Sequence, residues 1–177
     1  MPEHDAGATT RLHLLVLRCQ AGDERAFAQL FEAFGDRSLR YLRGLVGDAA
    51  DDIQQEVWLS VYRNIASLAK PNAFRTWLFS TTRHRALDYL RRQKRERELL
   101  EDARYEVGDA RLAEDPSLTD ELDTAMEQLS VLHREVLLLR YRNDMSYGEM
   151  ALVLGIPLGT VRTRLHHAKR RLQELLT

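Results

Sequence analysis

The sequence predicts an all-α protein built of two helical domains joined by a flexible acidic linker. Apolar residues recur at spacings of three and four along most of the chain, which is the period of an amphipathic helix. This spacing is lost between residues 98 and 118, where acidic residues accumulate and Gly108 and Pro116 interrupt the chain, as is typical of a linker. We therefore expect a first domain over residues 10–97 and a smaller second domain over residues 119–177.

Short breaks divide the helical pattern of the first domain. Gly22 and Gly47 separate the early apolar runs, and Lys70-Pro71-Asn72 ends the long run before it. Proline cannot continue a helix, and it disfavours helical backbone in the residue that precedes it. The predicted helices are Leu12–Cys19, Ala26–Phe34, Leu39–Val46, Asp51–Leu68 and Phe74–Arg92.

The second domain carries the most specific local pattern of the chain. Ser146 and Glu149 have the spacing of a capping box, in which each side chain bonds the other residue's backbone amide. Gly155 allows a sharp turn after this helix, and Pro157 suits the first turn of the next one. The predicted helices are Thr119–Leu129, Leu132–Tyr141, Tyr147–Leu154 and Leu158–Leu176.

The last two of these helices have the organisation of a helix-turn-helix. Val161 and Leu165 begin an apolar stripe, which leaves basic and polar side chains on the other face of the helix. The major groove of DNA admits one such helix, whose first residues reach base edges while later cations contact phosphates. A purely structural helical hairpin is the alternative. His166 and His167 are not expected to bind a metal, because adjacent helical residues point about 100° apart.

The charges are distributed unevenly along a chain whose net charge is −1. Residues 75–97 have a balance of +6, residues 98–127 of −9, and residues 158–177 of +4. Two basic segments on either side of an acidic one suit a nucleic-acid partner, although solvated helix faces explain the charges equally well. The lone Cys19, the absence of a long apolar run and the absence of a secretory signal favour a cytoplasmic location.

Several segments, taken in order, resemble the extracytoplasmic-function (ECF) sigma factors of the sigma-70 family. The chain is similar to the opening helix of region 2 at Gly22–Phe31, and to the polymerase-binding helix at Asp51–Leu59. The segment Phe74–Arg92 resembles the promoter-melting helix, and Arg134–Tyr141 with the following helix-turn-helix resembles region 4. The resemblance covers nearly the whole chain, and it implies that the two predicted domains are sigma regions 2 and 4.

The resemblance also implies partners and site residues. The partners are core RNA polymerase, through its beta-prime clamp helices and beta flap, promoter DNA, and an anti-sigma factor. Polymerase binding is expected at Asp51, Asp52, Gln55, Glu56 and Trp58. Contacts to the minus-ten element are expected at Lys70, Asn72, Arg75, Arg83, His84, Arg91 and Arg92. Contacts to the minus-thirty-five element are expected at Ser146, Tyr147, Arg162, Thr163, His166, His167, Lys169 and Arg170.

The function expected from these observations is promoter recognition, promoter melting and transcription initiation, with no catalysis. No nucleophile–base pair, phosphate loop or metal-ligand spacing is evident, so no catalytic residue, metal, cofactor or small-molecule substrate is predicted. Asp52 and Glu56 share a helix face, as in a magnesium-dependent nuclease, but no second carboxylate cluster accompanies them. A stand-alone helix-turn-helix regulator is the alternative, although it leaves Asp51–Leu59 without a role.

Overall fold

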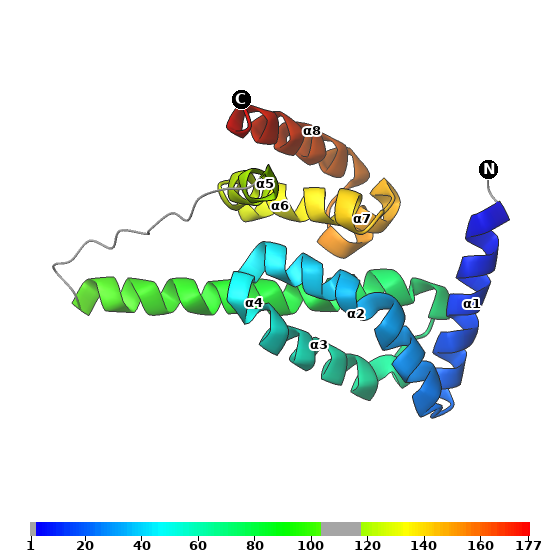
Figure 1. Cartoon of the computed structure of the whole chain (residues 1–177). Coiled ribbons are helices and arrows are strands. Elements are labelled where there is room, and N and C mark those ends of the chain that lie inside the picture. The colour runs from blue at the N-terminus through cyan, green and yellow to red at the C-terminus, as the bar shows by residue number, and fades with distance from the viewer. Residues whose placement is uncertain (1–2, 104–117) are drawn as a thin grey trace.

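The computed structural model describes residues 3–103 and 118–177, and every regular element in these ranges is helical (Figure 1). The predicted all-α class is therefore confirmed. None of the helices in the described ranges is long and apolar enough to span a membrane.

Four long helices and three short 3₁₀ turns form the first unit. They are α1 (Glu3–Gln20), α2 (Glu24–Val46), η1 (Gly47–Ala49), α3 (Ala50–Asn64), η2 (Ile65–Ser67), η3 (Pro71–Ala73) and α4 (Phe74–Ala103). Asp23 caps α2 by accepting hydrogen bonds from the amides of Arg25 and Ala26. The helix α2 is continuous over a stretch in which the sequence predicted two shorter helices.

The core of the first unit lies between α2, α3 and α4. Fully buried residues include Leu42 on α2, Val57 on α3 and Leu78 on α4. The rings of Tyr41 and Phe79 meet edge to face, with their centroids 5.7 Å apart. The inward-facing apolar residues recur at helical spacing, which is why the periodicity of the sequence identified these helices.

The helix α4 extends further than the sequence predicts. It runs to Ala103, through residues 98–103, which were expected to belong to the linker. Ion pairs between Arg91 and Asp88, and between Lys94 and Glu98, have the spacing that supports an exposed helix. The rest of the predicted linker, apart from the start of α5, lies outside the described residues.

The second unit consists of four shorter elements and one long helix, α8. They are α5 (Leu118–Glu127), α6 (Val131–Leu137), η4 (Leu138–Arg142), α7 (Tyr147–Leu154) and α8 (Leu158–Leu175). The wider π-helical turn η4 continues directly from α6. The predicted capping box on α7 is present in both directions, and Gly155 ends α7 with a left-handed φ of 65°. The helix-turn-helix has the predicted form.

The two units pack against each other and share one hydrophobic core. In Figure 1 the second unit lies over α2 and α4, with α6 and η4 touching α2, α7 touching α4, and α8 on the side away from both. Gly44 on α2 permits this approach, because a Cβ atom there would lie 2.7 Å from a methyl carbon of Leu138. The two predicted domains are thus held face to face.

Candidate nucleic-acid interface

An acidic face on α3 is open to solvent. Ile53 and Val57 point into the core, and this leaves the side chains of the opposite face exposed, namely those of Asp51, Asp52, Gln55 and Glu56. Arg43 lies 3.5 Å from Asp51, and Arg85 lies 3.8 Å from Glu56. Both ion pairs are well exposed, so each contributes little and leaves its carboxylate available to a partner.

Trp58 differs from the other residues predicted to bind polymerase, because it is a core residue. Only 5% of Trp58 is exposed, and its ring meets those of Phe27 and Phe31 edge to face. Its indole Nε1 donates a hydrogen bond to Oγ of Ser38 over 3.3 Å. Trp58 therefore cannot reach a partner directly, and the sequence-based expectation for it has to be corrected.

Sequence reasoning missed an apolar patch beside the acidic face. Phe31, Leu59 and Tyr62 are 47%, 49% and 54% exposed, although large apolar side chains are more often covered. The ring of Tyr62 rests against Phe27, which in turn contacts Trp58. Buried Trp58 thus supports an exposed aromatic surface, and α2 and α3 together present apolar and acidic groups side by side.

The loop between α3 and α4 presents two of the residues predicted to contact the minus-ten element. Lys70 and Asn72 are exposed, and Pro71 starts the short turn η3. The side-chain oxygen of Asn72 is hydrogen bonded to Nδ1 of His13, which belongs to α1. Further along α4, the side chains of His84, Arg91 and Arg92 are exposed. Arg91 forms an ion pair at 3.0 Å with Asp88 of the same helix.

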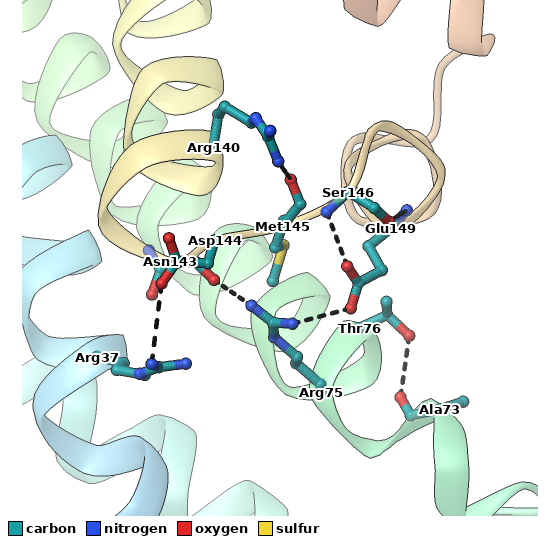
Figure 2. Close-up of polar contacts among 10 residues, drawn as sticks. All are labelled: Arg37, Ala73, Arg75, Thr76, Arg140, Asn143, Asp144, Met145, Ser146 and Glu149. Atoms are coloured by element: carbon teal, nitrogen blue, oxygen red, sulfur yellow. Dashed lines mark hydrogen bonds and ion pairs between the residues drawn. The ribbon is translucent and has the colours of Figure 1, made fainter. Parts of the chain in front are cut away.

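Arg75 is not free for DNA in this arrangement. Figure 2 shows its guanidinium reaching across to the second unit, where it donates to the carbonyl oxygen of Asn143 and to Oε1 of Glu149. The other oxygen of Glu149 accepts the Ser146 amide over 2.8 Å, as the capping box requires. One carboxylate thus caps α7 and binds α4 at the same time.

Arg83 is likewise occupied, by the fully buried carboxylate of Glu135 on α6. Arg83 Nε lies 2.8 Å from one oxygen of Glu135, and Arg164 of α8 lies 3.3 Å from the other. Burial lowers the pKa of Arg83, but its hydrogen bond to Glu135 and the negative charge there raise it by more, so the guanidinium stays charged. Burial, followed by the charge of Glu135, raises the pKa of nearby Tyr41.

The free face of α8 matches the sequence prediction more closely. Arg162, Thr163, His166, His167 and Arg170 are all exposed. Arg170 lies 3.3 Å from Glu174 on its own helix, and Thr163 donates back to the carbonyl oxygen of Gly159. At the start of α7, Ser146 is exposed and half-buried Tyr147 lies between the guanidinium groups of Arg140 and Arg162.

Lys169 occupies a different position from its predicted neighbours. Its ammonium lies over the ring of Tyr141, 5.2 Å from the centroid. A hydrogen bond to Tyr141, followed by the electrostatic interaction with the same side chain, raises the pKa of Lys169. Lys169 borders an apolar groove of about 310 Å³ between α5, α6, η4 and α8. Its charge is thus engaged within the second unit.

Sequence reasoning missed Glu135, which joins the two units through Arg83, and Arg164, which contacts the same carboxylate from within the second unit. One signal in the sequence indicated that Glu135 is buried. It directly precedes the apolar run Val136–Leu139, whose residues were expected to face inward. A carboxylate in such a place needs cationic partners when it is buried. The sequence could indicate that partners exist, but it could not identify Arg83 and Arg164.

The second unit contains a helix-turn-helix with a basic free face, and the first unit carries a long basic helix. This combination defines a DNA-binding protein. Comparison with known families specifies the class further. Residues 30–96 match sigma-70 region 2, and residues 119–172 match sigma-70 region 4. Together with the relatives described next, these matches show that the chain belongs to the ECF sigma factors, which direct RNA polymerase to promoters. The predicted family and function are confirmed.

Two curated relatives match nearly end to end. The ECF RNA polymerase sigma factor SigW of Bacillus subtilis is 30% identical over 91% of this chain and 94% of its own length. The RNA polymerase sigma-H factor of Pseudomonas aeruginosa is 32% identical over 92% of each chain.

Solved structures match the arrangement of the helices as well. CnrH in complex with the cytosolic domain of CnrY has a TM-score of 0.70 and 25% identity, over 93% of this chain and 96% of that one. The sigma factor RpoE of Bartonella quintana, in complex with the anti-sigma factor NepR, has a TM-score of 0.72 and 25% identity, over 85% and 96%.

Proposed function

We propose that the first unit binds core polymerase and captures the melted minus-ten strand, while α8 reads the minus-thirty-five element. The exposed acidic and aromatic surface of α2 and α3 supports the polymerase assignment, since a desolvated aromatic centre with charged surroundings is typical of tight interfaces. The exposed Arg162 and Thr163 near the start of α8 support the assignment of base readout. No residue is assigned a catalytic role.

The face-to-face packing of the two units has to open before both promoter elements can be bound. The elements are centred about 25 base pairs apart, which at ~3.4 Å per base pair is about 85 Å of duplex. Arg83 of the minus-ten surface and Arg164 of the recognition helix contact the same carboxylate, at 2.8 and 3.3 Å. A single chain cannot contact both elements while these two arginines share one partner.

The observation that carries this proposal is that region 4 carboxylates hold two arginines of the minus-ten surface. Glu149 binds Arg75 and Glu135 binds Arg83, so α4 cannot present either guanidinium to a phosphate. Polymerase binding would separate the two units and release both arginines. We place this event in the cytoplasm, with core RNA polymerase and promoter DNA as the partners.

We also propose an anti-sigma factor as a partner. CnrH is described in complex with the cytosolic domain of CnrY, and RpoE of Bartonella quintana in complex with the anti-sigma factor NepR. Both resemble this chain over most of its length. An anti-sigma factor that binds across both units would hold them closed and withhold Arg75 and Arg83.

Reconstitution with purified core polymerase tests the proposed function. We expect the full chain to co-migrate with core polymerase in gel filtration and to direct transcripts from promoters selected by the holoenzyme. Core polymerase alone is the control and should give no specific start site. Binding of duplex DNA without capture by polymerase would contradict the proposal and favour the stand-alone regulator.

A further inference from the structure

The helix α1 lies outside both matched family segments, since the region 2 match begins at residue 30. It is nevertheless well packed: Val16 is fully buried, and Leu12 and Leu15 are packed against the shared core. In Figure 1, α1 stands beside the connection between α3 and α4, and it contacts both η2 and η3. This position places α1 directly behind the minus-ten loop.

Gln20, the last residue of α1, fixes the start of that loop. Its amide nitrogen Nε2 donates to the carbonyl oxygen of Ile65 over 3.0 Å and to that of Leu68 over 2.8 Å. The carbonyl oxygen of Ile65 already accepts the Leu68 amide across η2, so Gln20 adds a second bond there and supplies a partner to the Leu68 carbonyl that follows the turn. One half-buried side chain therefore bridges both ends of η2 and sets where residues 69–72 begin.

His13 holds the other end of the loop. Its Nδ1 is hydrogen bonded to Oδ1 of Asn72, and because an amide oxygen can only accept, the imidazole is the donor. This contact orients the exposed Asn72 side chain, and the NH₂ group of Asn72 takes no part in it. His13 and Gln20 are separated by two helical turns, so a rigid helix holds both ends of the loop at a fixed separation.

The loop and α1 also border the same cavity. A cleft of about 900 Å³ is lined by Arg11 and Leu12 of α1, by Asn72 and Arg75, and by residues of α2 and of the second unit. The apolar side chain of Leu12 and the cation of Arg11 lie on the α1 side of this cleft. The second unit forms one wall of this cleft, so the cleft is open to DNA only when the two units separate, and Leu12 and Arg11 then remain beside the loop.

We infer that α1 is a positioning element of the minus-ten site: Gln20 and His13 hold the loop in the conformation that receives the non-template strand. The inference rests on the proposed role of the loop. Extracting a base from the duplex costs a few kcal/mol, so a loop that is already ordered avoids a further ordering cost at that step.

Two variants test the positioning role in the full chain. Gln20→Glu keeps the size of the side chain but removes both donors, and His13→Ala removes the contact to Asn72, whereas His13→Gln restores a donor. We expect roughly tenfold faster hydrogen exchange over residues 65–73 in Gln20→Glu, as for the loss of about 1.4 kcal/mol of local stability. Leu14→Ala, on the exposed side of α1, is the matched control and should exchange like wild type.

The functional readout is strand opening by the reconstituted holoenzyme. Permanganate reactivity of minus-ten thymines should fall several-fold in Gln20→Glu and His13→Ala, recover in His13→Gln, and stay normal in Leu14→Ala, while upstream duplex binding is unchanged. Wild-type exchange and opening in Gln20→Glu would overturn the inference, as would faster exchange with normal opening. Asn72→Ala tests the proposed role of the loop separately from the role of α1. Full opening by that variant would contradict the proposed role of the loop itself.

Discussion

The exposed side chains of α8 differ in what they are free to contact. Arg162 reaches solvent near the start of the helix, and its guanidinium carbon lies 6.0 Å from the centroid of the Tyr147 ring. Arg170 lies two turns later and pairs with Glu174, and Lys169 is held over Tyr141. At the level of single residues, Arg162 is therefore the strongest candidate for a base contact, while Arg170 is better placed for a phosphate.

We expect Arg162→Ala to lose about 1–3 kcal/mol of binding free energy for the upstream element that the protein prefers. The variant should also relax the base preference at one base pair of that element. Arg170→Ala should weaken binding to all upstream elements alike and reduce the salt dependence of binding. Fluorescence anisotropy against a set of duplexes with single base changes, at two salt concentrations, distinguishes the two patterns. A uniform loss in Arg162→Ala would assign that residue to a phosphate.

At the level of elements, α3 uses its two faces for different purposes. Its inward residues Ile53, Val57 and Val61 build the core, and its outward carboxylates lie next to exposed aromatic residues of α2 and α3. Because the surface ion pairs on this face are weak, its carboxylates contribute little to stability. Polymerase binding and folding can therefore be separated by mutation.

Reversing the charge of Asp52 and Glu56 to lysine should abolish capture of core polymerase and leave helical content and thermal unfolding nearly unchanged. Like charges facing a basic partner cost several kcal/mol at an interface, whereas exposed positions tolerate substitution. Pull-down of core polymerase, with circular dichroism of the same samples, provides the measurement. Asp123→Lys, on the exposed surface of α5, is the control. Wild-type holoenzyme formation by the double variant would refute the docking assignment.

Most elements could be predicted from the sequence, because local rules determine them. The bounds of α7 were predicted to the residue from a capping box and a glycine, both of which act within a few positions. The continuity of α2 was missed, since a polar stretch around Asp36 and Arg37 reads as an interruption until the second unit covers part of that helix. The occupation of Arg75 and Arg83 could not be predicted, because their partners lie 74 and 52 positions away.

At the scale of the whole molecule, polar contacts around Glu135 add to the shared hydrophobic core in holding the two units together. The side chains of Arg83 and Arg164 are only 14% and 19% exposed, and Glu135 is fully buried between them. Two guanidinium groups offset the cost of burying one carboxylate, and without it they would face each other unpaired. Closure therefore depends in part on the charge of Glu135.

Glu135→Gln should shift the chain toward the open arrangement. The substitution keeps the shape of the side chain, but removing one partner of a buried ion pair costs about 3–5 kcal/mol. We expect a larger radius of gyration by small-angle scattering, unchanged helical content, and tighter binding of single-stranded minus-ten DNA by the free chain. Glu174→Gln, which affects only exposed arginines of α8, should behave like wild type. An unchanged radius of gyration together with unchanged DNA affinity would contradict the role of Glu135.

The contact between Gly44 and Leu138 makes two distant positions interdependent during sequence divergence. Glycine weakens the middle of α2 by about 0.5–1 kcal/mol relative to alanine, so a mutation to alanine would strengthen the helix itself. The added methyl group would nevertheless lie within 3 Å of the Leu138 methyl carbons, so the Leu138 side chain would have to move at the contact between the units. A smaller residue at position 138 would remove this cost, and so the order in which the two substitutions occur would decide whether the intermediate protein carries the strain.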